Sequence, residues 1–128
     1  MFEIDMNFQN LQGKTPLHLA ANCQYPRKHI EVMLTYFGEI NPFVVDENGD
    51  TFLHIYFARP NITKDTFFFT RMLHGELPNL TKQHVQKLLN TQNKFLESPL
   101  LMFIKEKRDD VNVTNLQKII DAGSCVNL

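Results

Sequence analysis

A nine-residue pattern occurs three times in this chain and constrains its fold more than any other feature of the sequence. The copies are residues 13–21, 49–57 and 96–104, and a helical pattern followed by a glycine comes after each of them. From the hydroxyl residue of each copy to that glycine the intervals are 23, 24 and 25 positions. Near-equal intervals of this length are typical of repeat proteins, in which each repeat packs mainly against its neighbours.

Each copy contains the signals that begin a helix. Thr15, Thr51 and Ser98 can accept hydrogen bonds from the free backbone N–H groups of a helix N-terminus. Proline follows two of them, at the first helical position, where its missing N–H costs nothing. A second apolar pattern with helical spacing comes after each of these helices. Its residues are Ile30, Met33, Leu34 and Phe37; Phe68, Met72 and Leu73; and Val113, Leu116, Ile119 and Ile120. Three helix pairs are therefore predicted.

Residues 15–21, Thr-Pro-Leu-His-Leu-Ala-Ala, resemble the signature of the ankyrin repeat, Thr-Pro-Leu-His-x-Ala on a period of about 33 residues. Residues 10–13 and 46–49 resemble the hairpin tip that precedes each ankyrin repeat, and residues 123–127 resemble the segment that closes one. The resemblance implies an all-α, ankyrin-repeat-like solenoid of stacked helix pairs joined by hairpin loops. It divides a single domain, residues 1–128, into repeats at about 7–42, 43–79 and 93–128.

The chain departs from a regular repeat in two ways. The third copy of the pattern starts 47 positions after the second, whereas the second starts 36 positions after the first. We expect the surplus, about residues 80–92, to be a helical insertion with Thr81 as its cap and Val85, Leu88 and Leu89 as its apolar stripe. Residues 56–57 are Tyr and Phe where the first repeat has two alanines, so we expect an irregular stack after the first repeat.

Composition excludes several classes of protein. The 128 residues include 13 basic and 14 acidic side chains, a formal net charge of −1, which lacks the excess of basic residues typical of nucleic-acid binding. No run reaches the ~18 apolar residues of a membrane span, and the acidic start is unlike a signal peptide. Two cysteines are too few for a disulfide scaffold or a zinc ribbon. We expect an intracellular, cytoplasmic protein that binds neither nucleic acid nor membrane.

No catalytic or metal-binding motif accompanies the repeats. His18 and His54 share one repeat position, and the resemblance implies that both tie a hairpin to a helix by hydrogen bonds. The other histidines have no second ligand at metal spacing. Cys23 falls at the C-terminal end of a helix, where the helix dipole disfavours a reactive thiolate. We expect no enzyme activity, no metal, no cofactor and no small-molecule substrate.

The resemblance implies a non-catalytic function, the binding of another protein on the concave face formed by the hairpins and the inner helices. The residues expected to form this surface are Gln12, Lys14, Asn22 and Tyr25 in the first repeat; Glu47, Asn48, Asp50 and Arg59 in the second; and Lys94 and Lys105 in the third. Tyr25 and Arg59 are the favoured anchors, because interface hot spots are enriched in Tyr and Arg.

Two alternatives remain open at this point. In the first, the partner binds the inserted helix through exposed polar residues. These are Lys82, Gln83, Gln86 and Lys87. In the second, the chain is the targeting or substrate-recruiting module of a larger enzyme or effector whose catalytic part lies outside these residues.

Overall fold

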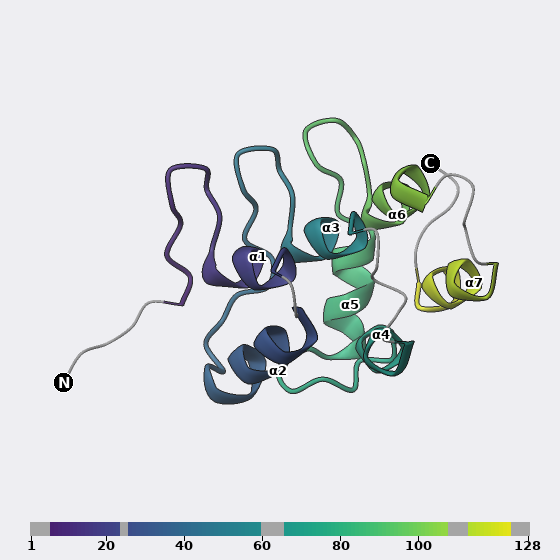
Figure 1. Cartoon of the computed structure of the whole chain (residues 1–128), viewed down its shortest axis with the longest axis horizontal. Coiled ribbons are helices and arrows are strands. Elements are labelled where there is room, and N and C mark those ends of the chain that lie inside the picture. Colours follow the sequence, from purple (N-terminus) through teal and green to yellow (C-terminus); the bar gives the residue numbers. More distant parts are fainter. Residues whose placement is uncertain (1–5, 24–25, 60–65, 108–112, 124–128) are drawn as a thin grey trace.

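Seven α-helices form the regular structure of the chain in the computed structural model, which describes residues 6–23, 26–59, 66–107 and 113–123 (Figure 1). They are α1 (Pro16–Ala21), α2 (Pro26–Tyr36), α3 (Phe52–Phe57), α4 (Thr66–Leu73), α5 (Lys82–Leu89), α6 (Pro99–Lys107) and α7 (Val113–Asp121). The described segments contain no strand, and an isolated antiparallel β-bridge pairs Leu77 with Leu80. The prediction of an all-α chain is confirmed.

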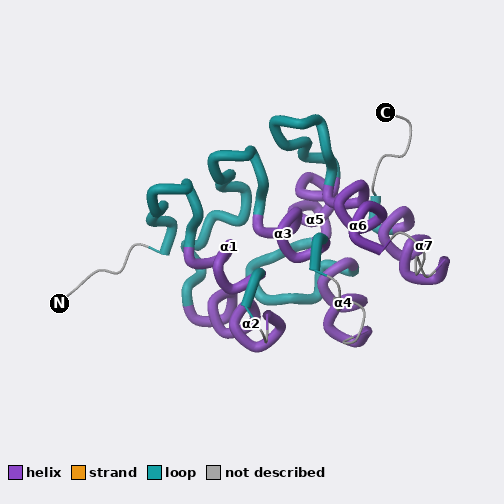
Figure 2. The backbone as a smooth tube through the Cα atoms, turned by 45° about the horizontal axis from the view of Figure 1, so that its top comes forward, coloured by secondary structure: helices purple, strands orange, loops and turns teal. Residues whose placement is uncertain are grey.

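The helices form two layers, and three loops project from the first of them. α1, α3 and α6 lie side by side in this layer, with α3 packed against both of the others (Figures 1 and 2). α2 packs against α1, while α4 contacts α5 and α7 on the far side of the first layer from the loops. Residues 8–15, 44–51 and 91–98 form the loops, which stand next to one another in a row (Figure 1). A unit of loop, first-layer helix and second-layer helix therefore occurs three times.

The first-layer helices begin where the capping residues of the sequence predict. Thr15 Oγ1 accepts the His18 backbone N–H at 3.4 Å, and the Thr15 backbone N–H donates to His18 Nδ1 at 3.1 Å. Thr51 and His54 form the same capping box before α3, and Ser98 Oγ accepts a backbone N–H before α6. Each box satisfies backbone donors that a helix N-terminus otherwise leaves free. Capping therefore fixes each helix start relative to its loop.

The predicted insertion is a helix, α5. Val85, Leu88 and Leu89 are fully buried, as the apolar stripe predicts. The helix contacts α4 and α6, so it joins the second layer of one unit to the first layer of the next. Its start holds a third capping box of the same kind, between Thr81 and His84. Thr81 is the predicted cap, whereas the part played by His84 is not predicted from the sequence.

Aromatic side chains fill the core beyond the first unit. Tyr56 and Phe57 of α3, which replace two alanines of α1, are both buried. The Phe57 ring centroid lies 5.7 Å from that of Phe69 in α4 and 6.2 Å from that of Phe103 in α6. Aromatic pairs at this separation stabilise a core beyond the burial of their surface. The bulky residues of α3 thus pack between α4 and α6, and α3 still contacts α1.

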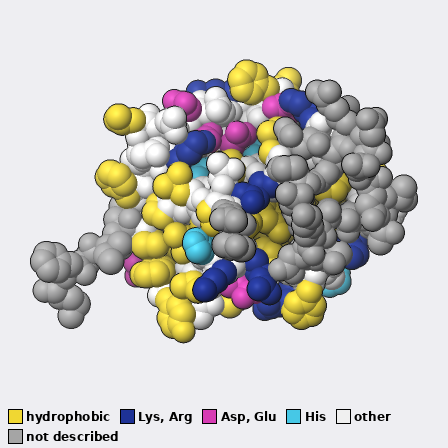
Figure 3. All heavy atoms as spheres, viewed as in Figure 1, with side chains coloured by type: hydrophobic (Ala, Val, Ile, Leu, Met, Phe, Trp, Pro, Cys, Tyr) yellow, Lys and Arg dark blue, Asp and Glu magenta, His cyan; other side chains and the backbone are white. Residues whose placement is uncertain are grey.

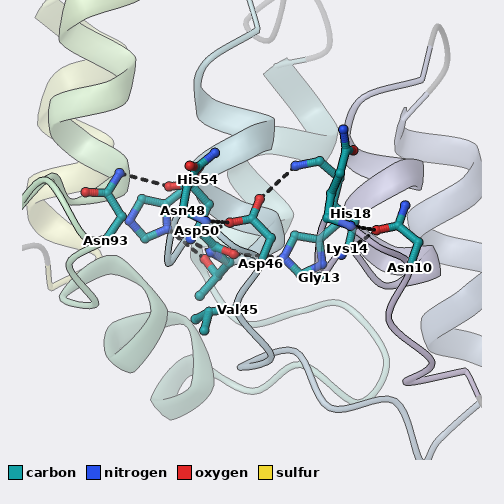
Figure 4. A network of polar contacts seen from close by, with 12 residues as sticks. Asn10, Gly13, Lys14, His18, Val45, Asp46, Asn48, Asp50, His54 and Asn93 are labelled. Carbon is teal, nitrogen blue, oxygen red and sulfur yellow. Dashed lines mark hydrogen bonds and ion pairs between the residues drawn. The ribbon is translucent and has the colours of Figure 1, made fainter.

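The three loops share one hydrogen-bond pattern, built on an Asn or Asp; Asn10 and Asp46, the residues on which the first two loops are built, are labelled in Figure 4. Asn10 Oδ1 accepts the backbone N–H groups two and four residues later, at 2.9 and 3.0 Å. Asp46 and Asn93 accept the corresponding N–H groups at 2.9 to 3.0 Å. The backbone C=O of each of these three residues also accepts the N–H three residues later. Each loop is therefore held in shape by its own Asn or Asp.

Backbone hydrogen bonds join each loop to the next. The Glu47 N–H donates to the Gln12 C=O, and the Lys94 N–H donates to the Asn48 C=O, both at 2.9 Å. This close approach requires glycine at position 13, because a Cβ on Gly13 would lie 3.0 Å from the Glu47 nitrogen. Gly13 also has a φ of +77°, a conformation that L-residues rarely adopt. The loops thus form a hydrogen-bonded row, which we call the loop ladder.

Gly13→Val should destabilise the fold more than Gln12→Val, its neighbour in the same loop. Valine resists a positive φ, at a cost of about 1–2 kcal/mol, and its Cβ would also meet the second loop. Gln12 is exposed, and its backbone C=O joins the ladder whatever its side chain. Urea unfolding of both variants measures the difference. Equal midpoints would contradict this loop geometry.

Candidate interaction surface

Polar side chains reinforce the loop ladder from one loop to the next (Figure 4). Lys14 Nζ lies 2.7 Å from Asp46 Oδ2, and the Asp46 side chain is fully buried. Asn93 Nδ2 donates to Asp50 Oδ1 at 2.9 Å. In both pairs, the last residue of one loop's turn contacts the first residue of the next turn. Side-chain contacts as well as backbone bonds therefore connect all three loops beside the first-layer helices.

Two buried histidines tie the first-layer helices to the loop that follows them. His18 Nδ1 accepts the Thr15 backbone N–H, so the neutral ring carries its hydrogen on Nε2, and Nε2–H donates to the Asp50 C=O at 2.8 Å. His54 bonds in the same way to the Glu97 C=O, at 2.9 Å. Both rings are almost completely buried. The expectation that these histidines are structural is confirmed by their hydrogen bonds.

Burial and hydrogen bonding set the protonation states of this network. Desolvation lowers the pKa of His18 and of His54 below the usual 6.5, although their bonds to backbone carbonyls favour the charged form. Burial alone would raise the pKa of Asp46, but the Lys14 ammonium and backbone N–H groups of the same loop outweigh it, so that pKa is lowered. At neutral pH the network therefore holds two neutral imidazoles and one buried carboxylate ion.

A hollow of about 490 Å³ lies beside the first two loops and the first-layer helices. Five of the ten residues predicted to bind a partner line it. They are Gln12, Lys14, Asn22, Asp50 and Arg59. They reach the hollow from the first two loops and from the C-terminal ends of α1 and α3. The structure thus brings half of the predicted surface together around one concavity.

An apolar strip crosses three helices and lines the same hollow. It consists of Leu19 of α1, Ile55 of α3 and Met102 of α6, each four residues after the capping residue of its helix. Leu19 is 54% exposed, although Leu17, Ala20 and Ala21 of the same helix are buried. None of the three residues of the strip is among those predicted from the sequence to bind a partner. Their shared repeat position is the signal that would have found them.

The other predicted binding residues lie outside the hollow. Glu47, Asn48 and Lys94 are exposed on the loops, and Lys105 of α6 forms an ion pair with Glu97. Tyr25, one of the two favoured anchors, lies outside the described residues. Acidic and basic side chains are interspersed along the loop-bearing edge, with hydrophobic side chains at its outer tips (Figure 3). The surface therefore combines both charges with apolar groups.

The alternative surface on α5 is polar. All four of its predicted residues are exposed: Lys82, Gln83, Gln86 and Lys87. Lys87 Nζ lies 4.7 Å from the centroid of the Phe43 ring, within the range of a cation–π interaction. One of the four side chains is thus already engaged within the fold.

The described residues hold no group of three or more His, Cys, Asp or Glu side chains arranged to bind a metal ion. Cys23 is a free thiol whose Sγ lies 3.0 Å from the Ala20 C=O. Among the helices of the described segments, none is long and apolar enough to cross a bilayer.

Neither protein-family models nor curated proteins give a match to this chain. The resemblance to ankyrin repeats therefore stays a prediction.

The free energy of unfolding should fall as the pH drops below about 6.5. Because the folded pKa values of His18 and His54 are lowered, the unfolded chain takes up protons there that the folded chain does not. Stability is full above pH 6.5 and decreases toward the folded pKa values, by at most about 1.4 kcal/mol per pH unit for each histidine. Urea unfolding from about pH 7.5 to 5 measures this slope.

His54→Gln is the matched control for this pH dependence. Glutamine can place an amide N–H near the position of Nε2 and does not titrate, so the slope should become shallower even if the variant is less stable throughout. An unchanged slope in His54→Gln would contradict the assignment of the pH dependence to the buried histidines.

Proposed function

We propose that this chain is a degenerate ankyrin-repeat domain whose hollow, beside the loop ladder, binds another protein. The proposal is supported by the threefold recurrence of a hairpin-shaped loop, a capped helix and a second helix. It is also supported by the two histidines that bond each helix to the following loop. On this proposal, the three units are the repeats, α5 is an insertion between the second and third of them, and the hollow lies on the concave face.

The apolar strip is the observation that carries the proposed function. Leu19 exposes an apolar side chain in the hollow, beside residues of α1 that are buried in the core. Lys14, Asp50 and Arg59 surround the strip with charged groups. An apolar centre with a polar rim is the usual composition of a protein–protein interface. Leu19 does not contribute a buried side chain to the core, so its exposure is better explained by a partner that covers it.

A non-catalytic role is part of the proposal. His18 and His54 engage both ring nitrogens in hydrogen bonds, so neither ring could transfer a proton to a substrate without breaking one of these bonds. A cytoplasmic location is also part of it, because the free thiol of Cys23 agrees with a reducing compartment. The same surface would serve a targeting module of a larger protein.

Leu19→Ser and Arg59→Ala should each weaken partner binding by about 1 kcal/mol or more, roughly five-fold in Kd. The partner is isolated from the native cells with the immobilised chain, and its affinity for each variant is then measured by calorimetric titration. Because Leu19 is half-exposed, Leu19→Ser should leave the melting temperature nearly unchanged.

Val32→Ser is the matched control, since Val32 is a half-exposed apolar residue of α2 that does not line the hollow. It should bind the partner like the wild-type chain. Undiminished affinity of the Leu19 and Arg59 variants, together with loss of binding on replacing Lys82 and Lys87 by alanine, would instead assign the partner to α5.

A further inference from the structure

Leu96 adopts a backbone conformation that glycine adopts in the other two loops. Its φ is +61°, whereas Gly13 and Gly49, the equivalent residues, have φ of +77° and +78°. A bulky L-residue rarely adopts this conformation, because its Cβ crowds the backbone. Strained residues of this kind persist where the surrounding structure imposes them, and they often mark a functional constraint. Leu96 is therefore an unusual residue for this backbone conformation.

In the first two loops, the glycine makes room for the next loop. An added Cβ would lie 3.0 Å from the Glu47 nitrogen at Gly13 and 2.9 Å from the Lys94 nitrogen at Gly49. A leucine at either position would exclude the next loop from the ladder. The Leu96 side chain is 70% exposed on the third loop. By its equivalence with the two glycines, it blocks the position that a fourth loop of the same register would take.

The two outer edges of the loop ladder are otherwise complementary. The Leu11 N–H of the first loop is at the position equivalent to the Glu47 and Lys94 N–H groups, which donate to the preceding loop. The Phe95 C=O of the third loop is at the position equivalent to the Gln12 and Asn48 C=O groups, which accept those bonds. Neither group has a hydrogen-bond partner among the described residues. The Leu11 side chain is fully exposed. Within the described part of the chain, one end of the ladder thus presents an unpaired donor, and the other end presents an unpaired acceptor.

The third unit lacks a second group that binds a following loop. His18 and His54 each donate to a backbone C=O of the next loop. The equivalent residue in α6 is Leu101, which has no side-chain donor and is 39% exposed. In this unit, Leu96 therefore stands in place of the glycine that leaves room for a following loop. Leu101 stands in place of the histidine that bonds to it.

We propose that Leu96 is an end-stop that keeps the first loop of a second copy of this chain from adding to the third loop. Without its side chain, the Leu11 N–H of one molecule would bond to the Phe95 C=O of another, and the ladder would continue between molecules. Contacts of this head-to-tail kind do not close on themselves, so they generate open chains of molecules. Unpaired backbone edges are a recognised route to such association, and proteins commonly block them.

Sedimentation velocity over a wide range of protein concentration tests the proposal with two variants at one position. Leu96→Gly removes both the strain and the Cβ, whereas Leu96→Asn relieves much of the strain but keeps a Cβ. The weight-average mass of L96G should rise steadily with concentration and pass that of a dimer. The wild-type chain and L96N should show no such rise.

Adding Leu11→Pro to L96G gives a second control. Proline removes the free N–H of the first loop and is favoured at the second position of such a turn, so the double variant should return to the mass of L96N. Equal sedimentation of L96G and L96N at every concentration would overturn the proposal. Association of L96G that persists in the double variant would overturn it as well.

Thermal unfolding checks the equivalence of the three loops on which the proposal depends. Because both single variants relieve a strained φ, their unfolding midpoints should lie at or above that of the wild-type chain. A lower midpoint for both L96G and L96N would contradict the equivalence of Leu96 with Gly13 and Gly49, and with it the end-stop.

Discussion

The hydrogen bonds between successive loops are the interaction on which the rest of the structure depends. Each loop takes its shape from its own Asn or Asp, and a backbone bond to the preceding loop positions the second and the third loop. His18 and His54 then carry that position into the helix layer, because each bonds a helix to the loop that follows. A short helix such as α1, only six residues long, is not stable alone and depends on this attachment.

The hollow follows from this arrangement of loops and helices. Since the loop ladder holds α1, α3 and α6 side by side, the residues four positions after each cap all line the hollow and form the apolar strip. The polar rim comes from the ends of the same loops, where Lys14 is held by Asp46. A partner would therefore meet side chains that are already positioned, which reduces the entropy lost on binding. The ladder that stabilises the fold thus also positions the residues of the proposed binding surface.

The sequence predicts the helices, the inserted helix and the first two loops, because their signals act within a few residues: a hydroxyl cap, a proline, a glycine and apolar spacing. The third loop has the same geometry, but Leu96 stands where glycine identifies the other two tips. The Lys14–Asp46 pair joins residues 32 positions apart, so it follows only from the stacking of loops. The apolar strip does not follow from the sequence for the same reason: Leu19 forms part of a strip only because the stacking of helices places Ile55 and Met102 at the same hollow.

Amide hydrogen exchange at three backbone positions tests the loop ladder most directly. The Glu47 and Lys94 N–H groups donate to the preceding loop, whereas the Leu11 N–H, at the corresponding position of the first loop, has no partner among the described residues. The Glu47 and Lys94 amides should exchange at least about 100-fold more slowly than the Leu11 amide, after correction for intrinsic rates. Exchange of all three amides at the same corrected rate would show that the loops are not hydrogen-bonded to one another, and would contradict the loop ladder.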